Sequence, residues 1–227
     1  MATQYPSIFN DVIGPVMRGP SSSHCAASVR IGRLARDLIQ GELQEILIEF
    51  DRHGSLATTH ESQGSDMGLF GGLLGWDATD ERLPASPEVI RQAGVQVQID
   101  IGDFHDPHPN TYRLSLKNAH FQHQLIALST GGGMIEVVEI DGFPLSLAGD
   151  YYETLLCLAS AGEQARQSLV EAGVAGSIVF VQQGERQLLQ VKGQAFVPDT
   201  LLDDLQERFP VRYVRKLAPV LPVLSRQ

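Results

Sequence analysis

The sequence contains few cysteines, few positive charges and no long hydrophobic run. Cys25 and Cys157 are too few for a disulfide framework, and neither has a neighbour at metal-ligand spacing. The 17 Lys and Arg residues are outnumbered by 27 Asp and Glu, and they form no basic cluster suited to nucleic acid. No apolar run is long enough to span a membrane, and residues 1–6 lack the features of a signal peptide. We therefore expect a cytoplasmic protein that binds neither nucleic acid nor membranes and holds no metal with its own residues.

The 227 residues are enough for one large domain or two small ones, and the remaining composition is that of an ordinary globular protein. Apolar residues recur at helical spacing over residues 24–40 and 67–76, and Ser86-Pro87-Glu88 begins a short helix that ends at Gly94. Strand patterns occupy residues 45–50, 95–101, 112–116, 124–128 and 134–140. We predict that these elements form an α+β domain over residues 1–147.

Residues 148–227 have a different order of elements. Apolar and amphipathic patterns indicate strand, helix, strand, strand, helix and strand at residues 153–158, 163–172, 178–181, 188–191, 199–209 and 211–217. Asp199 is the expected cap of the second helix. The βαββαβ order is typical of the ferredoxin-like arrangement, in which two helices cover one face of an antiparallel sheet. The sequence therefore predicts an α+β fold with two domains, 1–147 and 148–227.

Glycines interrupt the helical pattern of residues 67–76 at Gly68, Gly71, Gly72 and Gly75. Glycine lowers helix stability, so we expect these positions to serve the close approach of another backbone. The polar segment before this helix, Gln63-Gly64-Ser65-Asp66, fits a helix cap formed by Ser65 or Asp66.

The segment Gly19-Pro20-Ser21-Ser22-Ser23-His24-Cys25 leads directly into the first expected helix. The first turn of a helix has unpaired N–H groups and the positive end of the helix dipole, which favour a carboxylate or phosphate. One Ser side chain is enough to cap a helix, so the additional serines and His24 point to an anion site beside a group that transfers protons near neutral pH. A plain N-cap with spare serines is the structural alternative.

Other features have both a functional and a structural interpretation. His53 follows a strand and is either a site residue or a partner of the backbone. The segment His108-Pro109-Asn110-Thr111 is either part of a site or an ordinary turn. Gly131-Gly132-Gly133 lacks the helix and the Lys of a phosphate-binding loop, and it fits a bulge or a backbone close to a ligand. Cys25 is either a small buried hydrophobe or a thiol acidified by the helix N-terminus.

A series of short segments occurs in an order that matches one protein family. In chain order they are Ser7-Ile8-Phe9, Ile13-Gly14-Pro15-Val16-Met17, Gly19-Pro20-Ser21-Ser22-Ser23-His24, Arg30-Ile31-Gly32, His53-Gly54-Ser55, Gly64-Ser65-Asp66, Asp80-Glu81-Arg82, His108-Pro109-Asn110-Thr111 and Gly131-Gly132-Gly133. With this set, residues 5–147 resemble the β chain of iron–sulfur-dependent L-serine dehydratases. Residues 151–217 resemble, by pattern alone, the ACT regulatory domain that follows in two-chain members.

The resemblance implies a subunit that acts with an α chain, whose cysteines hold a [4Fe-4S] cluster. The implied reaction removes the α proton and the hydroxyl of L-serine and gives aminoacrylate, which hydrolyses to pyruvate and ammonia. The implied site consists of the substrate-binding residues Ser21, Ser22, Ser23, Cys25, Asn110 and Thr111 and the catalytic residues His24 and His53. The serines would bind the substrate carboxylate, and the two histidines would position the substrate or transfer a proton.

The sequence departs from the family pattern at two places. The family usually has Thr after the motif His, where this chain has Cys25. It usually has Gly-His-Gly-Thr-Asp, where this chain has Gln63 and Ser65 in place of the second His and the Thr. The first change puts a thiol beside the implied substrate, and the second removes a titratable group. L-serine, another β-substituted amino acid such as a sulfur-bearing one, and a loss of activity are all compatible with these changes.

Two further expectations concern regulation and assembly. The same β-type domain resembles the allosteric substrate-binding domain of some phosphoglycerate dehydrogenases, so a non-catalytic module that binds a small amino acid or anion is the alternative function. The ACT-like part predicts a homodimer, because pairing covers exposed strand edges. Its loop Ala159-Ser160-Ala161-Gly162 lacks the acidic and Pro-Gly features usual in ACT domains, which favours a structural role over ligand binding.

Overall fold

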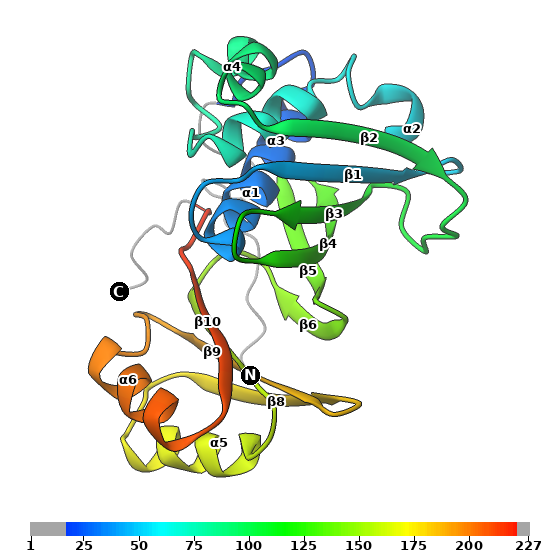
Figure 1. Ribbon diagram of the computed structural model, residues 1–227. Coiled ribbons are helices and arrows are strands. Elements are labelled where there is room, and N and C mark those ends of the chain that lie inside the picture. Colours follow the sequence, from blue (N-terminus) through cyan, green and yellow to red (C-terminus); the bar gives the residue numbers. More distant parts are fainter. Residues whose placement is uncertain (1–16, 222–227) are drawn as a thin grey trace.

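The computed structural model describes residues 17–221, which form two stacked units, each a β-sheet with helices (Figure 1). The motif residues 7–9 and 13–16 lie outside the described range. The first unit contains helices α1 to α4 and strands β1 to β6, and the second contains α5, α6 and β7 to β10. The expected α+β class is confirmed, and the two sheets are compatible with two domains.

The first unit has more elements than the sequence pattern indicates. Its helices are α1 (Ser22–Ile39), α2 (Leu56–Thr59), α3 (Ser65–Leu73) and α4 (Ser86–Gln92), with the 3-10 turn η2 (Leu83–Ala85) before α4. Its strands are β1 (Glu45–Asp51), β2 (Gln96–Gly102), β3 (Thr111–Lys117), β4 (Gln122–Gly131), β5 (Met134–Ile140) and β6 (Phe143–Leu147). The strand order is β2-β1-β3-β4-β5-β6, and only the β1–β2 pair is parallel within this sheet. All the expected elements are present, whereas α2 and β6 have no counterpart among them.

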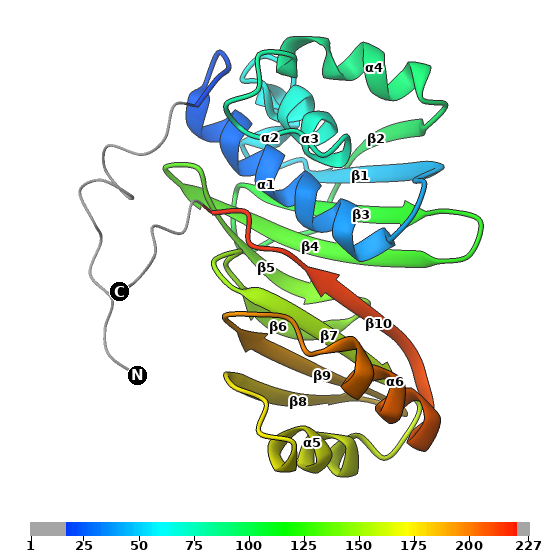
Figure 2. The ribbon, with the colours of Figure 1, turned by 90° about the vertical axis from the view of Figure 1, so that its left-hand side faces the viewer.

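The second unit has the βαββαβ order expected from its sequence. Its elements are β7 (Tyr152–Leu158), α5 (Gly162–Glu171), β8 (Ser177–Gln183), β9 (Arg186–Gly193), α6 (Asp199–Arg208) and β10 (Val211–Leu217). The strand order is β10-β7-β9-β8, with antiparallel neighbours throughout, and both helices lie on one face of the sheet (Figure 2). Pro198 occupies the cap position of α6, and the Asp199 carboxylate pairs with Lys216, so the expected Asp199 cap is wrong.

One hydrophobic core joins the two units. α1 lies across the first sheet and buries residues such as Leu34 in the main cluster (Figure 2). Leu155 and Cys157 of β7 belong to the same cluster, whereas Leu156 and Leu158 pack with α5 and α6. Alternate residues of a strand face opposite sides of its sheet, so β7 is buried on both faces. The second sheet therefore lies between the first unit and its own two helices.

α1 and α3 pack in direct backbone contact. A Cβ added at Gly68 would lie 2.4 Å from the carbonyl oxygen of Cys25, and one added at Gly72 would lie 2.1 Å from that of Val29. The expected close approach of another backbone is thus confirmed at these two glycines. Gly68 contacts Cys25, and Gly72, four residues later, contacts Val29, four residues after Cys25. The two helices therefore run parallel, and their N-termini lie at the same end.

The variant Gly72→Ala should lower the free energy of unfolding by about 1–3 kcal/mol, because its methyl group would press on the backbone of α1. The matched control is Gly71→Ala in the same helix, where an added Cβ would meet the end of the Leu83 side chain. A side chain can turn aside more easily than a backbone, so the control should lose less stability. Urea denaturation measures both variants, and equal stabilities would contradict the backbone contact.

Glu153, the second residue of β7, is a buried carboxylate between the two units. The residue is only 1% exposed. Gln190 Nε2 donates to Oε2 of Glu153 at 3.0 Å and to the carbonyl of Ser146 in the first unit at 3.3 Å. Oε1 of Glu153 has no hydrogen-bond partner within residues 17–221. Burial raises the pKa of Glu153 to about 7, and the hydrogen bond from Gln190 opposes this shift.

A raised carboxyl pKa means that the folded protein binds this proton more tightly than the unfolded chain. Stability should therefore fall as the pH rises from about 4.5 to 7, where the unfolded chain releases the proton first. The variant Glu153→Gln keeps the shape without the charge, and we expect it to be more stable than the original protein by on the order of 2–3 kcal/mol at pH 8 but not at pH 4.5.

Urea denaturation at the two pH values tests this expectation. Glu163→Gln is the control, since the Arg166 guanidinium holds the pKa of that exposed carboxyl below its usual range. Removing the Glu163 charge should lower the free energy of unfolding slightly at pH 8, whereas removing the Glu153 charge should raise it. If Glu153→Gln does not raise the free energy of unfolding at pH 8, the buried Glu153 charge does not destabilise the protein.

Candidate functional site

The residues singled out in the sequence gather at one end of the first sheet. β1 ends at Asp51 and its antiparallel neighbour β3 begins at Thr111, so the two strand ends adjoin. The loop after β1 contacts the loop before β3, because the Ser55 N–H donates to the Pro109 carbonyl at 2.9 Å and its hydroxyl bonds to Asn110 Oδ1. The N-termini of α1 and α3 lie at the same end of the unit.

The serine segment begins α1 and has unused hydrogen-bonding groups. Ser21 occupies the cap position, but its hydroxyl makes no capping bond, because Oγ lies 2.7 Å from Nδ1 of His24. The backbone N–H groups of Ser22, Ser23 and His24 have no acceptor within residues 17–221. The hydroxyls of Ser22 and Ser23 have no hydrogen-bond partner in the same range. α1 has no acidic residue in its first turn. The N-terminus thus offers several donors and a positive dipole end to an anion.

The N-terminus of α3 adjoins that of α1. The Ser21 N–H donates to the Gln63 carbonyl at 3.3 Å, and a Cβ on Gly64 would lie 3.0 Å from Pro20 Cδ. Gly64 caps α3 in a left-handed conformation without a side-chain hydrogen bond, so the expected cap by Ser65 or Asp66 is wrong. The Ser65 hydroxyl is buried and has no partner in the described part of the chain.

Asp66 instead pairs with a histidine that the sequence did not reveal. Nδ1 of His60 lies 2.9 and 2.7 Å from the two carboxylate oxygens of Asp66, and the ring stacks on Phe50 at 5.2 Å between centroids. Their side chains are only 19% and 15% exposed. Burial raises the pKa of Asp66, and the hydrogen bond from His60 opposes the shift. His60 thus places an imidazole against Asp66, three residues before Gln63.

His53 occupies a more open position than His24. Its side chain is 71% exposed, and its Nε2 lies 3.4 Å from the Asp103 carboxylate. Asp51 accepts the N–H groups of His53 and Asp106, each at 2.8 Å, and these bonds hold its pKa below the usual range. Across residues 17–221, no hydrogen bond or ion pair joins His53 to the Ser21–His24 pair. The structure therefore brings the two groups to the same end of the unit as separate clusters.

Two of the expected substrate-binding residues are buried. Cys25 is 0% exposed, and burial raises its pKa to about 11. The interpretation of Cys25 as an acidified thiol is therefore wrong, and the alternative interpretation as a small buried hydrophobe is confirmed. Thr111 is 3% exposed and donates its hydroxyl to the His108 carbonyl at 2.7 Å. Neither side chain reaches the solvent beside Ser22, so an expected contact between these two groups and a substrate is unsupported.

Several of the segments that resemble the family pattern form contacts at this end of the first unit. Gly131-Gly132-Gly133 forms the β4–β5 turn, all three with positive φ, and the register shifts there as the bulge interpretation expects. The Arg30 guanidinium donates to the Gly133 carbonyl. Arg18, just before the serine segment, pairs with Glu81, and its N–H bonds to the Ala78 carbonyl. These contacts position the start of α1.

No group of three or more His, Cys, Asp or Glu side chains within residues 17–221 is arranged to hold a metal ion. In the same range, no helix is both long enough and apolar enough to cross a bilayer.

Comparison with known proteins gives a family. No family model matches the sequence. The "Probable L-serine dehydratase, beta chain" of Bacillus subtilis (strain 168) is 32% identical over 225 residues, which cover 95% of this chain and 99% of that protein. The "L-serine dehydratase, beta chain" of Peptoniphilus asaccharolyticus is 34% identical over 150 residues, which cover 64% of this chain and 66% of that protein. Because the first similarity spans nearly the whole of both chains, this protein belongs to the family of L-serine dehydratase β chains.

Proposed function

We propose that this chain is the β subunit of an iron–sulfur-dependent L-serine dehydratase and that it binds the substrate carboxylate. Both relatives are named as β chains of L-serine dehydratase, and the similarity to one of them covers 95% of this chain. The β chain implies an α chain, with which this subunit would form the complete active site. The observation that carries the proposal is the open, donor-rich N-terminus of α1.

The carboxylate would lie at the adjoining N-termini of α1 and α3. Their dipoles point the same way, so the positive ends add at one place. The hydroxyls and N–H groups of Ser22 and Ser23 would donate to the carboxylate oxygens, as anions at helix N-termini are commonly held. Asp66 is the only acidic residue in the first turn of either helix, and its carboxylate lies 2.7 Å from Nδ1 of His60.

Proton transfer is assigned to the histidines beside this anion site. Nδ1 of His24 is held by Ser21, so Nε2 would face the substrate and remove or return a proton. Nδ1 of His60 is held by Asp66 in the same way, which makes His60 a second group for this role. His53, with its exposed ring, would position the substrate from the loop after β1.

The cluster is assigned to the α chain. Its usual ligands are cysteine thiolates, and both cysteines of this chain are buried with raised pKa values and lie in different clusters. The described residues therefore do not fit a cluster of their own. This subunit would contribute carboxylate binding, orientation and proton transfer.

L-serine is the proposed substrate despite Cys25. The residue lies under the first turn of α1 among Ala26, Val29 and Leu83, so the exchange of Thr for Cys alters packing below the site. A thiol in this buried position gives no reason to favour a sulfur-bearing substrate.

The test is co-expression with a cognate α chain under anaerobic conditions, followed by assay of pyruvate formed from L-serine. Ser22→Ala and Ser23→Ala should each raise KM about tenfold, because each removes a hydrogen bond to a carboxylate. His24→Gln should lower kcat about a hundredfold or more, as expected for a proton-transferring group. Ser160→Ala in the β7–α5 loop and His120→Gln in the β3–β4 turn, both at exposed positions outside the candidate site, are the matched controls.

Absence of pyruvate formation with a bound α chain would contradict the proposal. If the isolated chain bound L-serine by calorimetry and no α chain associated with it, the non-catalytic module would be the correct function instead. Activity unchanged in Ser22→Ala and Ser23→Ala would place the carboxylate elsewhere.

We also propose that the second unit is an ACT-like domain through which the chain forms a homodimer. Its element order supports this, and β8 is an outer strand with Val179 44% exposed. Pairing of such an edge with a second copy would cover its open N–H and C=O groups. Light scattering should give twice the mass of one chain, and Val179→Asp should shift the mass to that of the monomer. Ile101→Asp, on the outer strand β2 of the first unit, is the control and should remain dimeric.

A further inference from the structure

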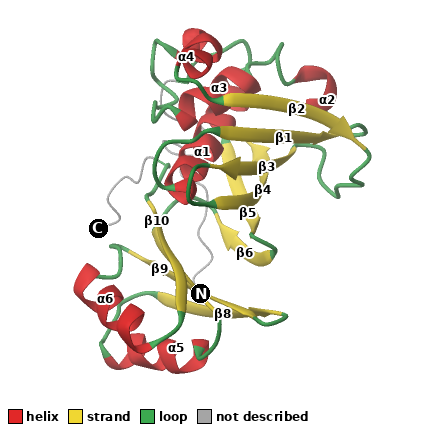
Figure 3. Ribbon diagram, viewed as in Figure 1, coloured by secondary structure: helices red, strands yellow, loops and turns green. Residues whose placement is uncertain are grey.

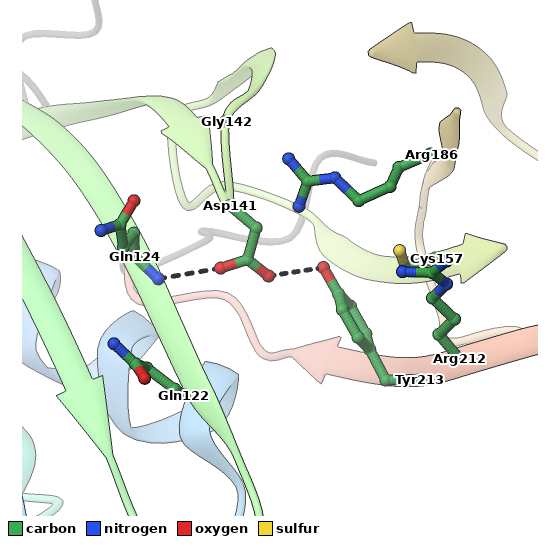
Figure 4. A pocket seen from close by; sticks show the side chains of 8 residues that line it. All are labelled: Gln122, Gln124, Asp141, Gly142, Cys157, Arg186, Arg212 and Tyr213. Atoms are coloured by element: carbon green, nitrogen blue, oxygen red, sulfur yellow. Dashed lines mark hydrogen bonds between the residues drawn. The ribbon is translucent and has the colours of Figure 1, made fainter. Parts of the chain in front are cut away.

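A pocket lies at the junction of the two units near the start of β4, whereas the candidate site lies near the end of β4 and the start of β3. Its volume is about 490 Å³, within the range of small-molecule sites. It is lined by Gln122, Gln124, Asp141, Gly142, Cys157, Arg186, Arg212 and Tyr213 (Figure 4). The two glutamines come from β4, Asp141 and Gly142 from the β5–β6 turn, and the remaining residues from the second sheet. Both units therefore build its wall.

Asp141 is fully occupied by contacts within the protein. Its Oδ1 accepts the N–H of Gln124 at 2.8 Å, and its Oδ2 accepts the Tyr213 hydroxyl at 2.7 Å (Figure 4). Oδ2 also lies 2.8 Å from Nδ1 of His123. These bonds hold the pKa of Asp141 below its usual range despite burial. The carboxylate therefore stays charged, but its oxygens already have their partners.

The two arginines of the pocket have no carboxylate partner. Arg186 of β9 lies over the Phe143 ring at 5.1 Å, and Arg212 of β10 forms no ion pair with the described acidic residues. In Figure 4, Arg186 extends toward Asp141, and Arg212 is drawn beside Cys157. Two guanidinium groups at one pocket are thus available to an outside ligand.

Two arginines without a carboxylate partner at one pocket are unusual in this acidic chain. Most Lys and Arg side chains of residues 17–221 lie within ion-pair distance of a carboxylate. The exceptions are Arg30, Arg36, Arg186, Arg212 and Arg215. Arg215 lies directly behind the pocket, where Nη2 is 3.0 Å from Nε2 of His123. Three guanidinium groups that form no ion pair within residues 17–221 therefore lie at this junction, in a protein of net charge −10.

We propose that this pocket binds a small organic acid through its carboxylate. A guanidinium presents parallel donors that match the two oxygens of a carboxylate, and Arg186 and Arg212 could share one or take one group each. The exposed amides of Gln122 and Gln124 supply further donors on the opposite wall. The site is distinct from the proposed serine-binding site and does not depend on that assignment.

A ligand in this position would contact both units. A ligand that binds only the folded protein stabilises it by an amount that grows with the logarithm of the ligand concentration above Kd, so a bound acid should raise the melting temperature of the full chain. Malonate and pyruvate, with two and one carboxylates, are the probes, and inorganic phosphate is the comparison anion. All are measured by calorimetry and thermal unfolding at equal ionic strength, because salt screens charge interactions.

We expect saturable binding of malonate or pyruvate, with phosphate at least about tenfold weaker. Arg186→Gln and Arg212→Gln should each raise the Kd for the better acid about tenfold or more. Arg91→Gln is the matched control, since Arg91 is exposed on α4 and pairs with Glu88. If Arg186→Gln fails to fold, Arg212→Gln decides the test, because Arg212 is exposed and its side chain forms no hydrogen bond with residues 17–221.

Three results would overturn the proposal. One is no saturable binding of either acid up to about 10 mM, a concentration that detects even millimolar affinity. Another is binding that is unchanged by both arginine substitutions. The last is phosphate binding as tightly as the acids, which would indicate a general anion site.

Discussion

The backbone contact between α1 and α3 is the constraint on which the site depends. Gly32 of α1 and Gly68 and Gly72 of α3 leave no room for a Cβ, since each would press on carbonyl oxygens of the facing helix. Two parallel helices this close have their N-termini side by side, and the Ser21 N–H bond to Gln63 joins the two starts. The positive dipole ends therefore coincide, although repulsion between them opposes the arrangement. Packing of the glycines in the core keeps them together, and an anion would relieve that repulsion.

The contact between α1 and α3 also explains the two departures from the family pattern, at Cys25 and Gln63, in structural terms. Cys25 lies on the face of α1 toward α3, with its carbonyl against Gly68, so this position is set by packing. Gln63 contributes its backbone carbonyl to Ser21, which any residue could do. Neither departure removes a donor from the start of α1. They therefore weigh less against L-serine as the substrate than the sequence alone suggests.

The sequence was sufficient for most elements and for the glycine contact, because apolar periodicity and glycine spacing are local signals. It was insufficient where a residue's role depends on a partner far along the chain. His60 and Asp66 are brought together by the turn after α2, which has no clear pattern. Asp141 looks like an ordinary turn residue, yet it accepts bonds from β4 and from Tyr213, 72 residues later. Caps were the least predictable, since Ser21, Asp66 and Asp199 all bond to side chains elsewhere.

The two units are mechanically connected through α1. Its 18 residues span about 27 Å, from the proposed carboxylate site to the junction with the second unit. At that far end, Gln40 Oε1 accepts a bond from Arg215 at 3.1 Å, and Asp37 accepts the N–H of Ala218 at 2.9 Å. The second unit also supplies Leu155 to the core in which α1 is packed. A helix held at its start by α3 and at its end by the segment around β10 cannot shift without disturbing one of these contacts. The position of the serine segment at the start of α1 therefore depends on both units.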